Sequence, residues 1–158
     1  MKRLITATTL TLAIVSLAPI AQAFGSLRDA KFPHLGNGNA SPNNARAISA
    51  THHFEVHIQG KALSALLIDL PEGVSIPKEI AVKNQSGEKI NAKVSVNNRT
   101  ATIEFAQAVP LETTLLINLR GVKTSRYGKT WIYQVYGKMV GLTSEIALGP
   151  AWVRTYDH

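Results

Sequence analysis

A set of potential metal ligands lies in residues 52–57, whose sequence is HHFEVH. On a β-strand, His53, Glu55 and His57 lie on one face at alternate positions, roughly 7 Å apart. Two imidazoles and a carboxylate are a suitable ligand set for zinc or copper. The pattern therefore allows a metal-dependent hydrolase centred on these three residues.

The same alternation has a simpler interpretation. Phe54, Val56 and Ile58 form an apolar face, so the polar residues between them are the solvated side of the strand. Neighbouring same-face residues of one strand rarely converge on a single ion without a ligand from another element. We therefore favour a protein without a metal or other cofactor, and keep the hydrolase as the alternative.

A second candidate site combines aromatic and basic side chains. All four tyrosines and both tryptophans follow residue 126, among several lysines and arginines. Aromatic faces beside cations can stack on sugars or on an anionic chain. The opposing interpretation, which we favour for the tryptophan of residues 127–136, is that a β-sandwich needs a large aromatic core residue. The candidate binding residues are Arg126, Tyr127, Lys129, Trp131, Tyr133 and Arg154.

Motifs for catalysis are not visible. The sequence lacks a Gly-x-Ser-x-Gly elbow, a phosphate loop and a His-Glu-x-x-His pair. Its aspartates are Asp29, Asp69 and Asp157, so a paired-carboxylate hydrolase would depend on glutamates at exposed strand positions. We therefore predict that the protein is not an enzyme.

The N-terminal 23 residues have the pattern of a secretory signal peptide. Lys2 and Arg3 precede an apolar run over residues 4–20, and Ala21-Gln22-Ala23 offers the small side chains that signal peptidase requires. A membrane span is disfavoured because the run is short and rich in threonine. Cleavage would leave a soluble periplasmic or extracellular protein without a further span.

The charge of the chain is unevenly distributed. Its 17 basic and 10 acidic residues give a net charge of +7, and no acid lies between Glu112 and Glu145. Such a stretch attracts anionic partners, and export favours an envelope polymer over nucleic acid. The alternative is that these lysines and arginines lie on solvated strand edges and in loops, without a ligand. The absence of cysteine excludes disulfides and thiol catalysis.

Residues 52–158 alternate with period two and show no sustained helical period. The clearest hairpin joins residues 89–96 to residues 101–105 through Asn97-Asn98-Arg99, and we expect Val94, Ile103, Phe105 and Ile117 in one core. About eight short strands predict a single all-β domain, an antiparallel β-sandwich of Ig-like or Greek-key type, with a small barrel as runner-up. Residues 24–51, rich in Gly, Asn and Pro, predict a flexible leader.

Four motifs resemble a family of exported cyanobacterial proteins that carry a domain of unknown function behind a signal peptide. The resemblance implies an exported β-rich domain, supplies no activity, and departs from the family at Leu111, where a second proline is common. The motifs are LPEG at 70–73, IEFAQAVP at 103–110, GKTWIYQVYG at 128–137 and LGPAWVRTYD at 148–157.

These observations predict an exported, non-catalytic binding or structural module of the cell envelope. Its partner would be an anionic polymer or glycan, or another protein. The sequence indicates neither a nucleic-acid partner nor an oligomeric state.

Overall fold

The computed structural model describes residues 32–76 and 79–157, so the predicted signal peptide lies outside the described residues. The described residues include no helix with the length and apolar character that a transmembrane span requires. Nine strands are present in this part of the chain: β1 (His34–Ser41), β2 (Ala50–His57), β3 (Leu63–Asp69), β4 (Glu79–Asn84), β5 (Ala92–Asn97), β6 (Thr100–Val109), β7 (Thr114–Val122), β8 (Thr130–Met139) and β9 (Ile146–Arg154).

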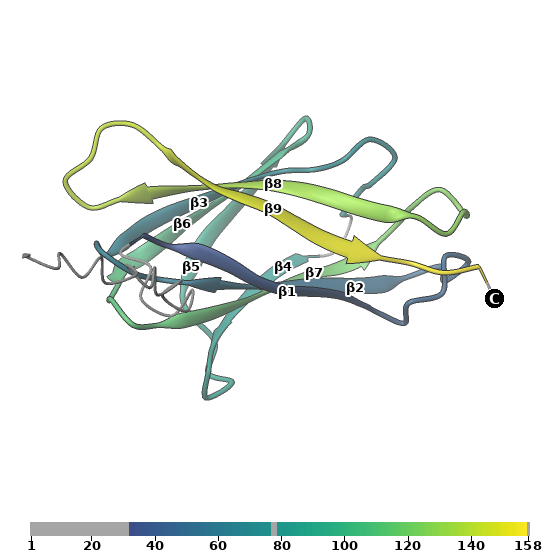
Figure 1. The fold of residues 1–158 in the computed structure, drawn as a ribbon, viewed down its shortest axis with the longest axis horizontal. Coiled ribbons are helices and arrows are strands. Elements are labelled where there is room, and N and C mark those ends of the chain that lie inside the picture. Colours follow the sequence, from purple (N-terminus) through teal and green to yellow (C-terminus); the bar gives the residue numbers. More distant parts are fainter. Residues whose placement is uncertain (1–31, 77–78, 158) are drawn as a thin grey trace, which may run out of the picture.

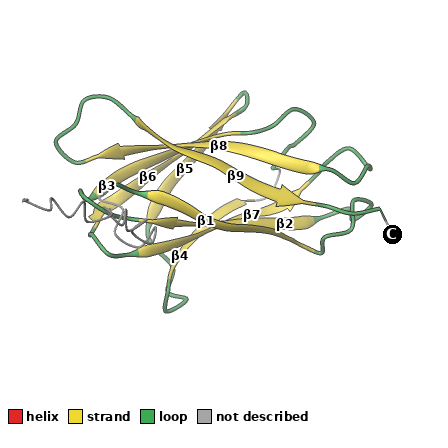
Figure 2. Cartoon of the chain, in the orientation of Figure 1, coloured by secondary structure: helices red, strands yellow, loops and turns green. Residues whose placement is uncertain are grey.

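The strands form two antiparallel sheets that pack face to face. One sheet has the order β1-β2-β7-β4 and the other has the order β5-β6-β3-β8-β9. Figure 1 shows the two layers, and Figure 2 shows that the described chain consists of strands and their connections. The predicted antiparallel β-sandwich is therefore confirmed, and the small barrel is not formed.

The core lies between the sheets and follows directly from the alternation of each strand. In β2, Phe54 and Val56 are fully buried, while Glu55 between them is half-buried. The opposing sheet contributes Ile103, Trp131 and Tyr133, also fully buried. Period-two patterning therefore selects the inward face correctly for strands in both sheets, β2, β6 and β8 among them.

The flexible leader predicted for residues 24–51 is corrected by the structure over its described part. Residues 34–41 form β1, which pairs with β2 from His34↔His57 to Ser41↔Thr51. This strand has few apolar side chains. It is held in place by its backbone pairing with β2 and by its contact with β9. At Gly38 the approach is so close that a Cβ would overlap the backbone carbonyl oxygen of Trp152.

The predicted hairpin is confirmed as β5 and β6, joined through Asn98 at a φ of 55°. The prediction that Val94 lies in the core is wrong, however. Val94 is 36% exposed, although its cross-strand partner Ile103 is fully buried. Strand β5 is at the edge of its sheet. The opposing sheet therefore does not cover the inward-facing side chain of Val94.

Candidate functional site

Two of the predicted binding residues belong to the core. The Trp131 ring is fully buried, its Nε1–H donates to Thr155 Oγ1 at 3.0 Å, and Lys129 Nζ lies 4.3 Å from the ring centroid. Tyr133 is also fully buried, and its hydroxyl forms a hydrogen bond with His52. Neither ring offers a face to a ligand, so Trp131 and Tyr133 are removed from the candidate binding surface.

The environment of the buried pair shifts both ionisation equilibria. Burial, together with the nearby His53, lowers the pKa of His52 to about 4. Burial also raises the pKa of Tyr133 well above its usual range. Both side chains are therefore neutral at pH 7, which suits a structural contact inside a sandwich.

The remaining predicted binding residues lie together at one end of the sandwich. Arg126, Tyr127, Lys129 and Arg154 are all exposed, and the Tyr127 side chain is 75% exposed. They come from the connection between β7 and β8 and from the end of β9. Figure 1 shows this connection, the C-terminal segment and the loop between β1 and β2 at the same end of the molecule.

Two small hollows at this end of the sandwich are lined by basic side chains. One, of about 260 Å³, includes Lys129 and Arg154 in its lining, together with Tyr156 and Asp157. The other, of about 170 Å³, is lined by residues 46–48, 123, 124 and 126. We call the surface formed by Arg46, Lys123, Arg126, Lys129 and Arg154 the basic end.

Sequence reasoning missed Arg46, which is distant in the chain from the aromatic stretch, and it counted Lys123 only as part of the acid-free stretch between Glu112 and Glu145, not as a binding residue. Backbone hydrogen bonds bring the β1–β2 loop to the C-terminal segment: Ala45 N–H donates to Tyr156 O at 2.9 Å. Lys123 and Ser75 exchange two backbone hydrogen bonds of 2.9 and 3.0 Å. No local pattern in the sequence signals these contacts.

Trp152 is an exposed aromatic that was also missed as a site residue. It is 59% exposed on the outer face of β9, and its cross-strand partner Ile132 on β8 is 40% exposed. On the same face, Arg154 Nε–H donates to Thr130 Oγ1 at 3.3 Å. The sequence signal that would have placed the Trp152 ring outside is the apolar pair Ala151 and Val153 at alternate positions. Both are buried on the opposite face of β9.

The potential metal ligands lie on the outer face of β2. Glu55 Oε2 lies 3.5 Å from His57 Nε2, and a 2.9 Å hydrogen bond joins His57 Nδ1 to Thr114 Oγ1. The ring of His34, from β1, stacks on the ring of His57, with the two centroids 4.9 Å apart. Within the described ranges, no three side chains of the His, Cys, Asp or Glu type are placed to hold a metal ion.

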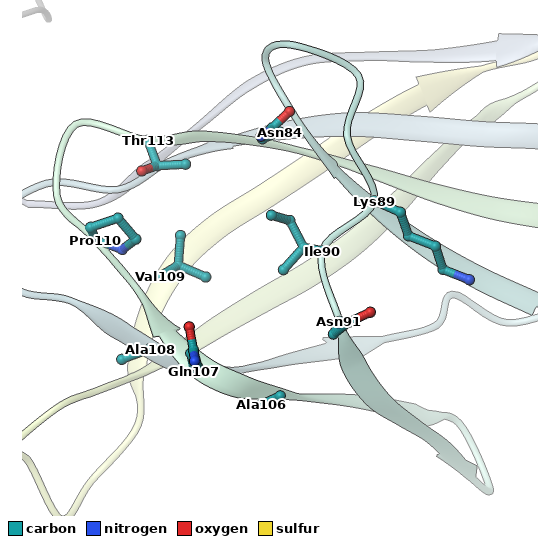
Figure 3. Close-up of a pocket in the computed structure, with 10 residues that line it drawn as sticks. All are labelled: Asn84, Lys89, Ile90, Asn91, Ala106, Gln107, Ala108, Val109, Pro110 and Thr113. Carbon is teal, nitrogen blue, oxygen red and sulfur yellow. The ribbon is translucent and has the colours of Figure 1, made fainter.

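A further hollow of about 440 Å³ lies between the β4–β5 connection and the end of β6. Figure 3 shows Ile90 and Val109 extending into it and Lys89 extending away. Lys89 is the sole ionisable residue of its lining, which otherwise consists of amide, hydroxyl and apolar groups. The hollow therefore has no acid and base pair for catalysis.

Comparison with known proteins assigns the chain at the level of family and fold. A family model described as "Protein of unknown function (DUF2808)" matches residues 23–142. No curated protein matches the chain. The similarity that the motifs indicated is thus confirmed for a domain of unknown function.

Several solved structures share the fold at low sequence identity. BslA, a bacterial hydrophobin, has a TM-score of 0.54 at 12% identity over 80% of this chain and 95% of its own. The N-terminal domain of a Streptococcus gordonii adhesin has a TM-score of 0.52 at 14% identity, over 80% and 33%. A non-cellulosomal cohesin from Archaeoglobus fulgidus has a TM-score of 0.50 at 7% identity, over 80% and 92%.

Proposed function

The chain belongs to the DUF2808 family, whose description assigns no activity, and we propose that it is an exported, non-catalytic module that binds an anionic polymer of the cell envelope through its basic end. The signal-peptide pattern of residues 1–23 supports export. The lack of a recognisable catalytic motif in the sequence supports a non-catalytic role.

One observation carries the proposal: exposed cations from three separate segments lie at one end of the sandwich beside the exposed ring of Tyr127. Asp157 is the one carboxylate in the lining of the two hollows, and its Oδ1 accepts a hydrogen bond from Gly128 N–H at 2.7 Å. The positive charge of this end is therefore largely available to a ligand. Cations and an aromatic face together suit an acidic polysaccharide.

The fold is consistent with a binding role. Similar structures include domains named as an adhesin and a cohesin, and both names describe binding proteins. In a sandwich, the strands hold the end loops at fixed positions, and such loops are where binding residues concentrate.

The proposal is tested by retention of the purified protein on isolated envelope material. We expect the double variant Arg126→Glu and Lys129→Glu to lose most retention, and added salt to lower the retention of the wild type steeply, because exposed charges are screened over roughly 10 Å at 0.1 M. Lys61→Glu, in the loop between β2 and β3, is the matched control and should retain wild-type binding. Circular dichroism checks that the variants are folded.

Retention that resists both charge reversal and salt would overturn the anionic-polymer proposal. A protein partner, recognised through apolar contacts such as Trp152 and Ile132, would then be the better explanation.

A further inference from the structure

We propose that the hollow between Arg46, Lys123 and Arg126 is a binding site for a phosphoryl group. This inference rests on the proposed function, because it names the acidic group of the polymer that the basic end would bind. It also adds Arg46 and Lys123 to the candidate binding residues.

The site is a concave surface with cations on both sides. Its volume is about 170 Å³, and its lining consists of Arg46, Ala47, Ile48, Lys123, Thr124 and Arg126. The first three residues belong to the β1–β2 connection, and the others to the β7–β8 connection. No carboxylate is part of this lining, so three positive charges surround one small space.

These cations have no carboxylate partner in the part of the chain that the structure describes. The ion pairs there are Glu55 with His57 and Glu79 with Arg120. Three like charges around one hollow repel each other, and an anion seated between them would relieve that repulsion.

The backbone on both sides of the hollow is held in place. On one side, Ala45 N–H donates to Tyr156 O at 2.9 Å, which ties the β1–β2 connection to the C-terminal segment. On the other, Lys123 exchanges backbone hydrogen bonds of 2.9 and 3.0 Å with Ser75. Because these segments are ordered before a ligand arrives, binding an anion costs less conformational entropy.

The number and type of cations favour a phosphoryl group over a carboxylate. A guanidinium group presents paired N–H donors that match two oxygens of a phosphate. A phosphate monoester carries about −1.5 to −2 charges at pH 7, against one for a carboxylate, and three cations complement the higher charge better. Thr124 adds a hydroxyl in the same lining.

The first test titrates the purified protein with inorganic phosphate, followed by amide NMR shifts. We expect saturable shifts confined to residues 46–48 and 123–126, with the affinity lowered roughly tenfold by Arg46→Gln or Lys123→Gln. Lys61→Gln is the control and should bind phosphate like the wild type. Shifts that do not saturate, or that acetate reproduces at the same concentration, would overturn the inference.

The second test separates this inference from the proposed function. Retention on envelope material is compared before and after chemical removal of its phosphate groups, and we expect removal to abolish most of it. Salt-sensitive retention that survives removal would overturn the phosphoryl site and leave the anionic-polymer function standing. Specific binding of inorganic phosphate without any retention would support the site and overturn the function.

Discussion

His52 Nδ1 and the Tyr133 hydroxyl share a hydrogen bond of 2.7 Å that crosses the core and joins the two sheets. His52 belongs to β2 of one sheet and Tyr133 to β8 of the other. The second ring nitrogen, Nε2, is buried without a hydrogen-bond partner among the described residues. The pair thus links the two sheets, and one buried polar atom remains without a hydrogen bond.

Stability should fall in acid because of His52. Its pKa is about 4 in the folded protein, against the ordinary 6.5 when unfolded. Between these values the unfolded chain binds a proton that the folded chain does not, so stability decreases as pH falls from 6.5 to 4, by about 3 kcal/mol. Urea unfolding at several pH values measures this loss. A His52→Leu variant with the same slope would show that another group is responsible.

Removing the hydroxyl of Tyr133 should destabilise the fold although the ring is kept. In Tyr133→Phe the His52 ring loses its hydrogen bond and stays buried, which costs about 1–3 kcal/mol. Tyr127→Phe is the matched control, since this exposed side chain should change stability by less than about 0.5 kcal/mol. Equal effects in thermal or urea unfolding would contradict the structural role of the pair.

Truncation of Phe105 should be far more costly than truncation of Val94. Phe105 is 9% exposed and its loss should cost about 3–5 kcal/mol, whereas Val94→Ala on the uncovered part of β5 should cost less than about 1 kcal/mol. Denaturant unfolding of both variants gives the comparison. A large loss for Val94→Ala would mean that this face of β5 is covered in solution.

The contact between β1 and β9 should be sensitive to a single methyl group. Gly38→Ala places a Cβ against the Trp152 carbonyl oxygen, and because backbone must shift to make room, we expect a loss of about 1–3 kcal/mol. Asn37→Ala, an exposed neighbour, serves as the control. A Gly38→Ala variant of unchanged melting temperature would refute the close approach.

The histidines of β2 should not hold a metal. Both ring nitrogens of His57 already face protein groups, Thr114 at 2.9 Å and Glu55 at 3.5 Å. Elemental analysis should find no stoichiometric zinc or copper in the purified protein, and a chelator should leave its melting temperature unchanged. A chelator that lowers the melting temperature would contradict this prediction and support the alternative of a metal-dependent hydrolase.

Much of the fold was predictable because the direction of a side chain in a strand is a local property. Alternation alone identified the buried faces around Phe54, Ile103 and Ile117, and asparagine at position 98 marked the β5–β6 turn. The need of a sandwich for a large aromatic core residue favoured Trp131, and its ring is fully buried. These inferences need no knowledge of which strands pair.

Burial, by contrast, depends on what lies opposite, and only the tertiary structure decides that. Val94 alternates as regularly as its partner Ile103, yet it is exposed because β5 is an edge strand. Strand β1 has almost no apolar pattern, yet its backbone pairs with β2 along most of its length. Sequence alone therefore determined the class of fold and the inward faces. The placement of Arg46 beside Lys123 and Arg126 was decided by long-range backbone pairing, which no local period encodes.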